Sequence, residues 1–167
     1  MSVTHVPPGD GRSLWVLSEL MTNKVTSDQT GGAYSLFEVA TQPGGDVLPH
    51  VQHREDEAFY VLEGEYEFLV EGHTIRAGAG SLLYVPKGTL HAHKNVGAEV
   101  GRMLVGQTPG GLYERFFEEV GEEVTSKVVV PSVKEVPPEA ARIVMTAARY
   151  GIEIALPSEL RRGHFAP

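Results

Sequence analysis

The sequence predicts an all-β fold, a single antiparallel sandwich or barrel followed by one or two C-terminal helices. Short β-prone runs alternate with glycine-rich breaks up to about residue 107, and apolar residues take up a helical spacing after Gly111. The length of 167 residues suits one domain, and we find no internal repeat. We expect N-terminal strands or an arm over 1–30, a barrel core over 31–110, and a helical extension packed on the barrel over 111–167.

The predicted strands are short and separated by tight turns. The first covers residues 14–17, and the second covers 33–40 and ends at the turn sequence QPGG. The clearest later strands are 58–62, 66–70, 81–85, 91–96 and 100–105. Strands spaced this closely favour an antiparallel sandwich or barrel.

Two helices are predicted after the barrel. Residues Leu112–Val120 have apolar groups at helical spacing and are followed by Gly121, which suits a C-cap. Residues 139–150 form the stronger helix, with prolines at its start and a glycine after it. Its apolar stripe consists of Ala140, Ile143, Val144 and Ala147. Residues 122–138, rich in valine and proline, are expected to connect the two helices.

The composition excludes several classes of function. The chain has no cysteine, so disulfides, zinc–thiolate sites, iron–sulfur clusters and a cysteine nucleophile are ruled out. Its formal charge of −8, from 14 basic and 22 acidic residues, disfavours nucleic acid and anionic membranes as partners. No apolar run approaches the ~20 residues of a spanning helix, and the start lacks the features of a secretory signal. We therefore expect a cytoplasmic protein that binds a small molecule.

Two clusters of polar residues, about forty positions apart, carry the signal for a metal site. The first has Gly44, His50, Glu57 and Gly64 at fixed spacings. The second has the pattern Gly-x5-Pro-x-Gly-x2-His-x3-Asn from Gly80 to Asn95 and contains Pro86, Gly88 and His91. One strand can present residues 50 and 52 on one face, a carboxylate can return to that face after a bend, and a neighbouring strand can add an imidazole. Imidazole and carboxylate together suit one divalent ion of iron, nickel, cobalt, manganese, copper or zinc.

These two clusters resemble the paired motifs of the cupin superfamily. The second family motif is matched at every fixed position, and the first is matched at Gly44, His50, Glu57 and Gly64. Residues 53–65 (HREDEAFYVLEGE), with 114–119 (ERFFEE) and 148–152 (ARYGI), are similar to small bacterial quercetin-dioxygenase-like cupins of one barrel. The resemblance implies a jelly-roll-type β-barrel, a metal held by His50, Gln52, Glu57 and His91, and a homodimer.

The chain departs from the first motif at one position. The family has its second histidine where this chain has Gln52. Either Gln52 occupies the ligand position, through its amide oxygen or with water beside it, or a local bulge turns His53 inward. Simple alternation along a strand favours Gln52. The remaining histidines are not expected to bind the metal. His93 shares the strand face of His91 and either lines the pocket or packs in the core. No role is assigned to His5, His73 and His164.

Three functions are compatible with this site. The resemblance implies a dioxygenase-like oxidoreductase acting on a flavonol-like or other enolisable aromatic small molecule, with Glu57 as a ligand or as the base that takes the substrate proton. The first alternative is a cupin isomerase or cyclase in which the metal is a Lewis acid. The second is a non-catalytic binding protein whose metal site has eroded at Gln52. Phe59, Val61 and Leu83 are candidates for an apolar pocket wall. Whether the protein is an enzyme thus stays open at the level of sequence.

Overall fold

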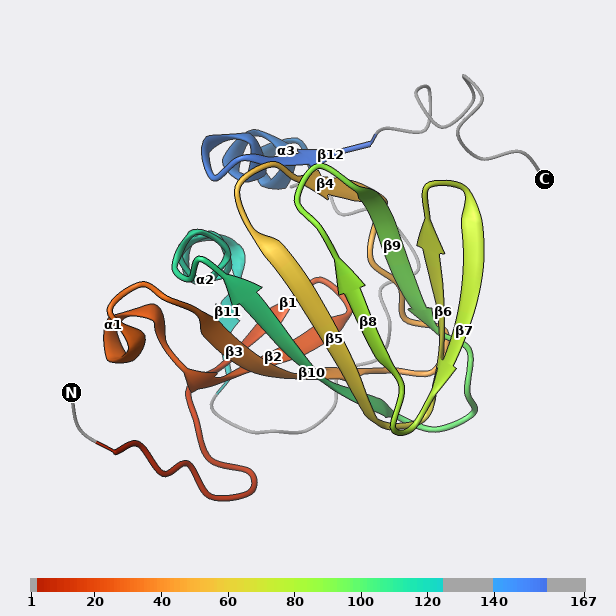
Figure 1. Ribbon diagram of the computed structural model, residues 1–167, viewed down its shortest axis with the longest axis horizontal. Coiled ribbons are helices and arrows are strands. Elements are labelled where there is room, and N and C mark those ends of the chain that lie inside the picture. Colours follow the sequence, from red (N-terminus) through yellow and green to blue (C-terminus); the bar gives the residue numbers. More distant parts are fainter. Residues whose placement is uncertain (1–2, 125–139, 156–167) are drawn as a thin grey trace.

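The computed structural model describes residues 3–124 and 140–155, which form two facing β-sheets with helices at one end (Figure 1). The strand order of the seven-stranded sheet is β11 (Glu122–Glu123), β1 (Ser13–Val16), β2 (Glu19–Val25), β3 (Ser35–Thr41), β10 (Gly101–Thr108), β5 (Asp56–Glu63) and β8 (Leu82–Val85). The order of the five-stranded sheet is β12 (Ile152–Ile154), β4 (His50–Gln52), β9 (Leu90–Asn95), β6 (Glu65–Val70) and β7 (His73–Gly78). The strand pairs are antiparallel, so the predicted all-β fold is confirmed.

The hydrophobic core lies between the two sheets and follows the alternation of the strands. In β10, for example, Gly101, Met103, Val105 and Gln107 are buried while the residues between them are more exposed. The facing sheet contributes Phe68, which is fully buried and packs on Phe59 with ring centroids 5.2 Å apart. Because the inward faces of β3, β5, β6 and β10 are largely apolar, the two sheets bury these faces against each other.

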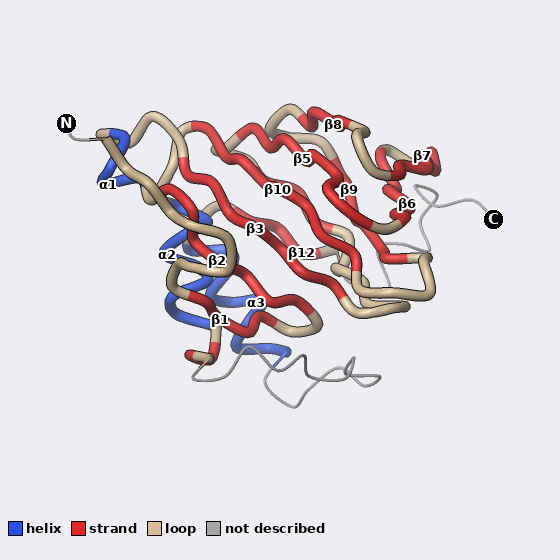
Figure 2. The backbone as a smooth tube through the Cα atoms, turned by 90° about the horizontal axis from the view of Figure 1, so that it is seen from below, coloured by secondary structure: helices blue, strands red, loops and turns tan. Residues whose placement is uncertain are grey.

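Three helices accompany the sheets: α1 (Ser27–Thr30), α2 (Leu112–Val120) and α3 (Ala140–Arg149). They gather on one side of the sheets when the molecule is seen from below (Figure 2). The bounds of α2 are those predicted, and its Phe117 meets Phe37 of β3 edge to face at 5.5 Å. Tyr150, just after α3, packs on Phe116 of α2 with ring centroids 6.2 Å apart. These aromatic contacts hold α2 over one end of the space between the sheets.

The start of α2 is capped by a residue from a distant part of the chain. Glu55 is buried, and its Oε1 accepts hydrogen bonds from the backbone N–H groups of Leu112 and Tyr113 at 3.0 and 3.4 Å. A carboxyl oxygen at this end satisfies backbone amides that have no partner within the helix. The cap holds the backbone at Tyr113, whose side chain lines the cavity of the candidate site.

Several predicted strands are confirmed, and others were missed. Strands β5, β6, β8, β9 and β10 overlap the predicted runs with shifted ends. We did not predict β2, because its sequence ELMTNKV lacks a simple alternation, or β7, whose first four residues are exposed on an edge strand. Most of the predicted connector, residues 122–138, lies outside the described residues, although Glu122–Glu123 forms a short strand that pairs with β1.

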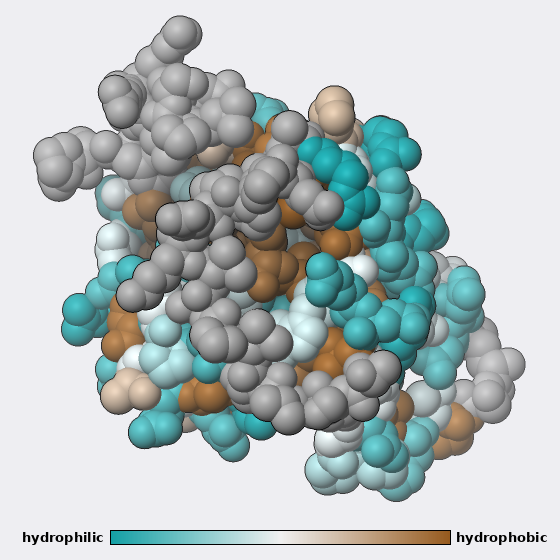
Figure 3. Space-filling model, turned by 180° about the vertical axis from the view of Figure 1, so that it is seen from behind, coloured by the Kyte–Doolittle hydropathy of each residue, from teal (hydrophilic) through white to brown (hydrophobic). Residues whose placement is uncertain are grey.

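The surface is largely hydrophilic but not uniformly so. Figure 3 shows apolar side chains gathered near the centre of the rear face and hydrophilic side chains along one flank. No helix within the described ranges combines the length and the apolar character needed to cross a bilayer.

Candidate metal centre

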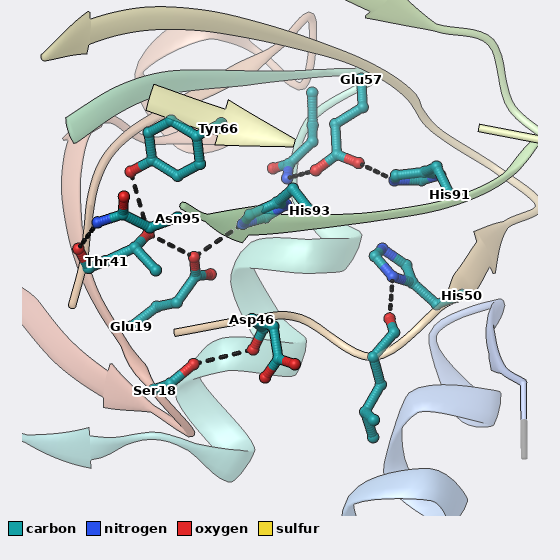
Figure 4. A network of polar contacts seen from close by, with 12 residues as sticks. Ser18, Glu19, Thr41, Asp46, His50, Glu57, Tyr66, His91, His93 and Asn95 are labelled. Carbon is teal, nitrogen blue, oxygen red and sulfur yellow. Dashed lines mark hydrogen bonds and ion pairs between the residues drawn. The ribbon is translucent and has the colours of Figure 1, made fainter. Parts of the chain in front are cut away.

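Three buried side chains from three strands meet between the sheets. His50 lies on β4, Glu57 on β5 and His91 on β9, and they are 4%, 3% and 1% exposed. His50 and His91 are direct partners in the antiparallel register of β4 and β9, while Glu57 faces them from the other sheet. One potential ligand atom from each residue lies within 4.8 Å of the others (Figure 4). Both sheets must therefore pack correctly before this cluster exists.

Backbone carbonyls orient both imidazole rings. Nδ1 of His50 is 2.9 Å from the carbonyl oxygen of Leu48, and Nδ1 of His91 is 3.0 Å from that of Thr89. Because a carbonyl only accepts, each Nδ1 carries a proton, which leaves the Nε2 atoms for the centre of the cluster. Nε2 of His50 is buried and has no hydrogen-bond partner in the described structure. A buried acceptor of this kind is what an imidazole ligand to a metal presents.

Glu57 connects His91 with two glutamine side chains. Its Oε2 accepts a hydrogen bond from Nε2 of Gln52 at 2.9 Å and lies 2.9 Å from Nε2 of His91, and its Oε1 accepts from Nε2 of Gln107 at 3.0 Å. With protons on both ring nitrogens, His91 is an imidazolium that forms a buried ion pair with Glu57. The carboxylate thus holds one proton on His91 in the space where the three ligand atoms converge.

The pKa values of the cluster follow from burial and from this pair. Burial alone would raise the pKa of Glu57, but the hydrogen bond and charge of His91 outweigh it, and the pKa lies below its ordinary value. Burial would lower the pKa of His91, but Glu57 raises it above its ordinary value. Burial, together with the charge of His91, lowers the pKa of His50 to about 4, so this ring is neutral at pH 7 and has a free lone pair.

The structure places Gln52, not His53, beside Glu57. Gln52 is 3% exposed, and its amide oxygen is buried without a hydrogen-bond partner among the described residues. His53 points outward and forms an ion pair with Glu153 of β12 at 2.8 Å. Strand β4 keeps its regular register through Gln52, which pairs with Ile152, so no bulge turns His53 inward.

The donor set fits a first-row divalent ion. Two Nε2 atoms and a carboxylate oxygen converge, and the unpartnered amide oxygen of Gln52 lies next to them. His50, Glu57 and His91 would hold the metal, with Gln52 as a neutral oxygen ligand or as a hydrogen-bond donor to Glu57. When bound, such an ion would supply Lewis acidity and, for iron, copper, manganese, nickel or cobalt, a redox centre. Metal and proton compete for the same atoms, because the ion would take the place of the proton on His91.

A cavity of about 60 Å³ opens beside the cluster and is lined mostly by apolar side chains. Of the three predicted pocket residues, only Phe59 lines this cavity. Val61 is buried in the core, and the partly buried Leu83 packs against the core. Tyr113 of α2 also lines the cavity and stacks on His50, with ring centroids 6.4 Å apart and planes 12° apart. Burial, with the nearby carboxylates of Glu57 and Glu19, raises the pKa of Tyr113 well above its ordinary value, so its hydroxyl keeps its proton.

Comparison with known proteins identifies the family. Residues 37–106 match the family called the cupin domain, and this range contains His50, Glu57 and His91. Residues 37–106 of this protein therefore form a cupin domain. The cupin matches quercetin 2,3-dioxygenase of Bacillus subtilis with 27% identity over 114 residues, which is 68% of the chain and 33% of the relative. It also matches the dimethylsulfoniopropionate lyase DddQ of Ruegeria pomeroyi with 42% identity over 55 residues, 32% of the chain and 27% of that relative. The cupin thus spans a third or less of the length of each of these curated relatives.

Solved structures support the same fold. The cupin superposes on KdgF from Halomonas sp. with a TM-score of 0.59 and 17% identity, covering 66% of this chain and 96% of the other. It superposes on a predicted oxalate decarboxylase from Thermotoga maritima with a TM-score of 0.60 and 19% identity, covering 64% and 99% of the two chains. At these identities the likeness establishes the jelly-roll-type fold and no activity.

The other predicted or unassigned histidines have different surroundings in this cupin. His93 is 7% exposed, lines the cavity and bonds to Glu19 of β2. His5 and His73 are exposed, and His164 lies outside the described residues. Sequence reasoning missed three residues near the centre, namely Glu19, Gln107 and Tyr113. A signal existed only for Gln107, which alternates with the buried Val105 and Met103 on β10.

Proposed function

We propose that this cupin is a metal-dependent enzyme whose single divalent ion is held by His50, Glu57 and His91, with Gln52 beside it. The observation that carries the proposal is the convergence of three buried ligand atoms within 4.8 Å at the wall of a cavity. The unpartnered Nε2 of His50 supports it, because a buried acceptor without a partner is costly unless something binds it. Gln52 is a weaker ligand than imidazole, so the affinity for metal is expected to be lower than in a site with three histidines.

The proposed reaction is the oxygenation of a small enolisable molecule. The match to quercetin 2,3-dioxygenase of Bacillus subtilis supports a dioxygenase-like reaction. The cavity of about 60 Å³ favours a substrate much smaller than a three-ring flavonol. Small enolisable compounds without an aromatic ring are therefore the preferred candidates.

Glu57 is the proposed catalytic residue. A carboxylate held by Gln52 and Gln107 through hydrogen bonds of 2.9 and 3.0 Å has a fixed orientation toward the cavity. To act as the base, it would leave the metal and accept the acidic proton of the substrate as the substrate anion forms. The apolar side chains around it, Phe59 among them, exclude water and so strengthen the interaction of the carboxylate with its partners.

The first experiment measures metal content and oxygen uptake together. Protein loaded anaerobically with iron, nickel, cobalt, manganese, copper or zinc should contain about one ion per chain. His91→Ala should abolish this binding, and His53→Ala is the matched control, because His53 is an exposed histidine that faces Glu153. Loaded protein should then consume oxygen with at least one enolisable or catechol-like compound. An oxygen electrode that records no uptake with the whole panel would refute the dioxygenase, and a parent that binds no ion while Gln52→His does would indicate an eroded site.

A second reaction class has its own support. The match to the dimethylsulfoniopropionate lyase of Ruegeria pomeroyi is with an enzyme named for an elimination, and the small cavity suits a small substrate. A lyase, isomerase or cyclase would use the metal as a Lewis acid and would not need oxygen. Turnover under strictly anaerobic conditions would favour this class over the dioxygenase.

We also propose that the cupin forms a homodimer through the outer face of the seven-stranded sheet. Tyr60, Leu82 and Tyr84 on β5 and β8 are 42%, 67% and 57% exposed on that face. Leu82 pairs with Tyr60 across the strands, and β8 is an edge strand, which invites a partner. Analytical ultracentrifugation of the parent and of Leu82→Lys tests this, since the charged variant should sediment as a monomer.

A further inference from the structure

The cavity has a second polar group that the proposed metal centre does not use. Among its lining residues, Glu19 and His93 join His50, Glu57 and Tyr113 as the polar ones, and the other lining side chains are apolar. Glu19 is the first residue of β2, and His93 lies on β9 in the opposite sheet. Nε2 of His93 lies 2.8 Å from Oε1 of Glu19, and both side chains are buried (Figure 4).

The hydrogen bonds of this pair are unevenly distributed. Oε1 of Glu19 accepts from His93 and from the hydroxyl of Thr41 at 2.8 Å, and Thr41 in turn accepts from the hydroxyl of Tyr66 at 3.2 Å. In the described part of the chain, no hydrogen bond reaches the other oxygen, Oε2. Nδ1 of His93 is also buried without a partner. A buried carboxylate and a buried ring nitrogen with free capacity at a cavity wall both call for a donor from a bound molecule.

We propose that Glu19 and His93 form a second subsite that binds the hydroxyl group of a small ligand, while the other polar end of the ligand reaches the metal centre. The second half of this statement rests on the proposed function. His91 and His93 are two positions apart on one strand face, so the two subsites are separated by about 7 Å. The ring of Phe59 lies between them, with its centroid 6.0 Å from the ring of His91 and 5.6 Å from that of His93. The ligand class is thus a short, largely apolar molecule with an acidic oxygen at one end and a hydroxyl at the other.

A purely structural role is the competing account. The pair joins the two sheets, and a hydrogen bond between them would stabilise the fold whether or not a ligand binds. The two accounts differ in one measurable quantity, the preference of the cavity for a hydroxyl. If the hydrogen bond is only structural, replacing Glu19 would change the stability of the protein but not the preference of the cavity for a hydroxyl.

The first arm of the test needs no metal. 1-Propanol and 1-chloropropane are neutral and similar in size, and their affinities for metal-free parent and for Glu19→Leu are measured by NMR titration. The ratio of the two affinities should shift toward 1-chloropropane on the order of tenfold in Glu19→Leu, because a hydrogen bond to the carboxyl group is lost. Thr41→Val is the matched control: it removes a donor to Glu19 outside the cavity and should leave the ratio unchanged.

Some results would overturn the proposal. A ratio that is the same in the parent and in Glu19→Leu would assign the pair a structural role alone. If Glu19→Leu does not fold, Glu19→Gln and intermolecular NOEs between the propanol methylene protons and the His93 ring in the parent decide the question. Absence of those NOEs, or absence of binding by either probe, would refute the subsite.

The second arm uses protein loaded with zinc. Binding of 4-hydroxybutyrate should exceed that of butyrate in the parent, and the difference should vanish in Glu19→Leu. Equal binding of the two acids by the loaded parent would refute the bridging ligand. If zinc does not bind, the proposed metal enzyme fails, while the propanol comparison still decides whether Glu19 and His93 recognise a hydroxyl.

Discussion

Replacing His50 by asparagine should change how the stability of the metal-free protein depends on pH. The side chain of His50 is 4% exposed, and its pKa is lowered from 6.5 to about 4 by burial and by the charge of His91. Between these two values the unfolded chain binds a proton at this side chain that the folded protein does not bind. The free energy of unfolding therefore falls as the pH is lowered through this range.

The size of the effect follows from the two pKa values. At about 1.4 kcal/mol per pKa unit, the full difference corresponds to about 3 kcal/mol, of which about 2 kcal/mol is lost between pH 7 and pH 5. Glu55 acts in the opposite direction over part of the same range, because burial raises its pKa to about 7. The effect of His50 must consequently be read from the difference between the parent and His50→Asn.

The assay is urea unfolding of both proteins in the presence of a chelator, at several values from pH 7 to pH 5. Asparagine suits the comparison because its amide N–H can replace Nδ1 as the donor to the carbonyl of Leu48, and it does not titrate. The parent should lose about 2 kcal/mol relative to the variant over this range. The exposed His53, replaced by asparagine, serves as the control for the exchange of a histidine that is not buried in the site. A constant difference between the parent and His50→Asn would show that burial does not keep His50 neutral, so that Nε2 of His50 has no free lone pair for a metal.

Three further predictions concern the metal, the helix cap and a turn. Gln52→His should bind divalent metal more tightly, on the order of tenfold, because imidazole is a better ligand than a neutral amide; calorimetric titration showing equal or weaker affinity would contradict the placement of Gln52 at the centre. Glu55→Gln should become more stable relative to the parent as the pH rises from 5 to 8, by about 2–3 kcal/mol, because the raised pKa of Glu55 stabilises the fold only while the group is protonated; parallel urea profiles would disprove this. Gly64→Ala should destabilise by about 1–2 kcal/mol, since Gly64 has φ +85° and a Cβ would lie 2.9 Å from Cα of Gly101. Gly78→Ala, at a position with open space, is the control, and equal melting temperatures for the two variants would count against the strain.

Local sequence was sufficient for the elements whose signals are local. Short β-prone runs, the turns between them and the apolar spacing of α2 with Gly121 after it each act over a few residues, and the predicted elements are present. The paired motifs were equally informative about the family, because their glycines and histidines sit at spacings that one topology brings together. Alternation along β4 also favoured Gln52 over His53 as the inward side chain, and the structure has this arrangement.

Contacts between the two sheets had no such local signal. Glu19 and His93 are 74 positions apart, and Tyr113 reaches the cavity only because Glu55 caps α2 and aromatic rings hold the helix over the barrel. Strand β12 extends the five-stranded sheet beside β4, although its three residues carry no distinctive pattern.

The amino-acid sequence by itself therefore determined that this chain is a cupin barrel with two histidines and a glutamate available for a metal. The tertiary structure decided which further side chains surround them, namely Gln107, which bonds to Glu57, and Tyr113, Glu19 and His93, which line the cavity. The physical reason is that strand periodicity specifies which face a side chain occupies, whereas the packing of one sheet against the other, and of α2 against both, specifies what that side chain meets.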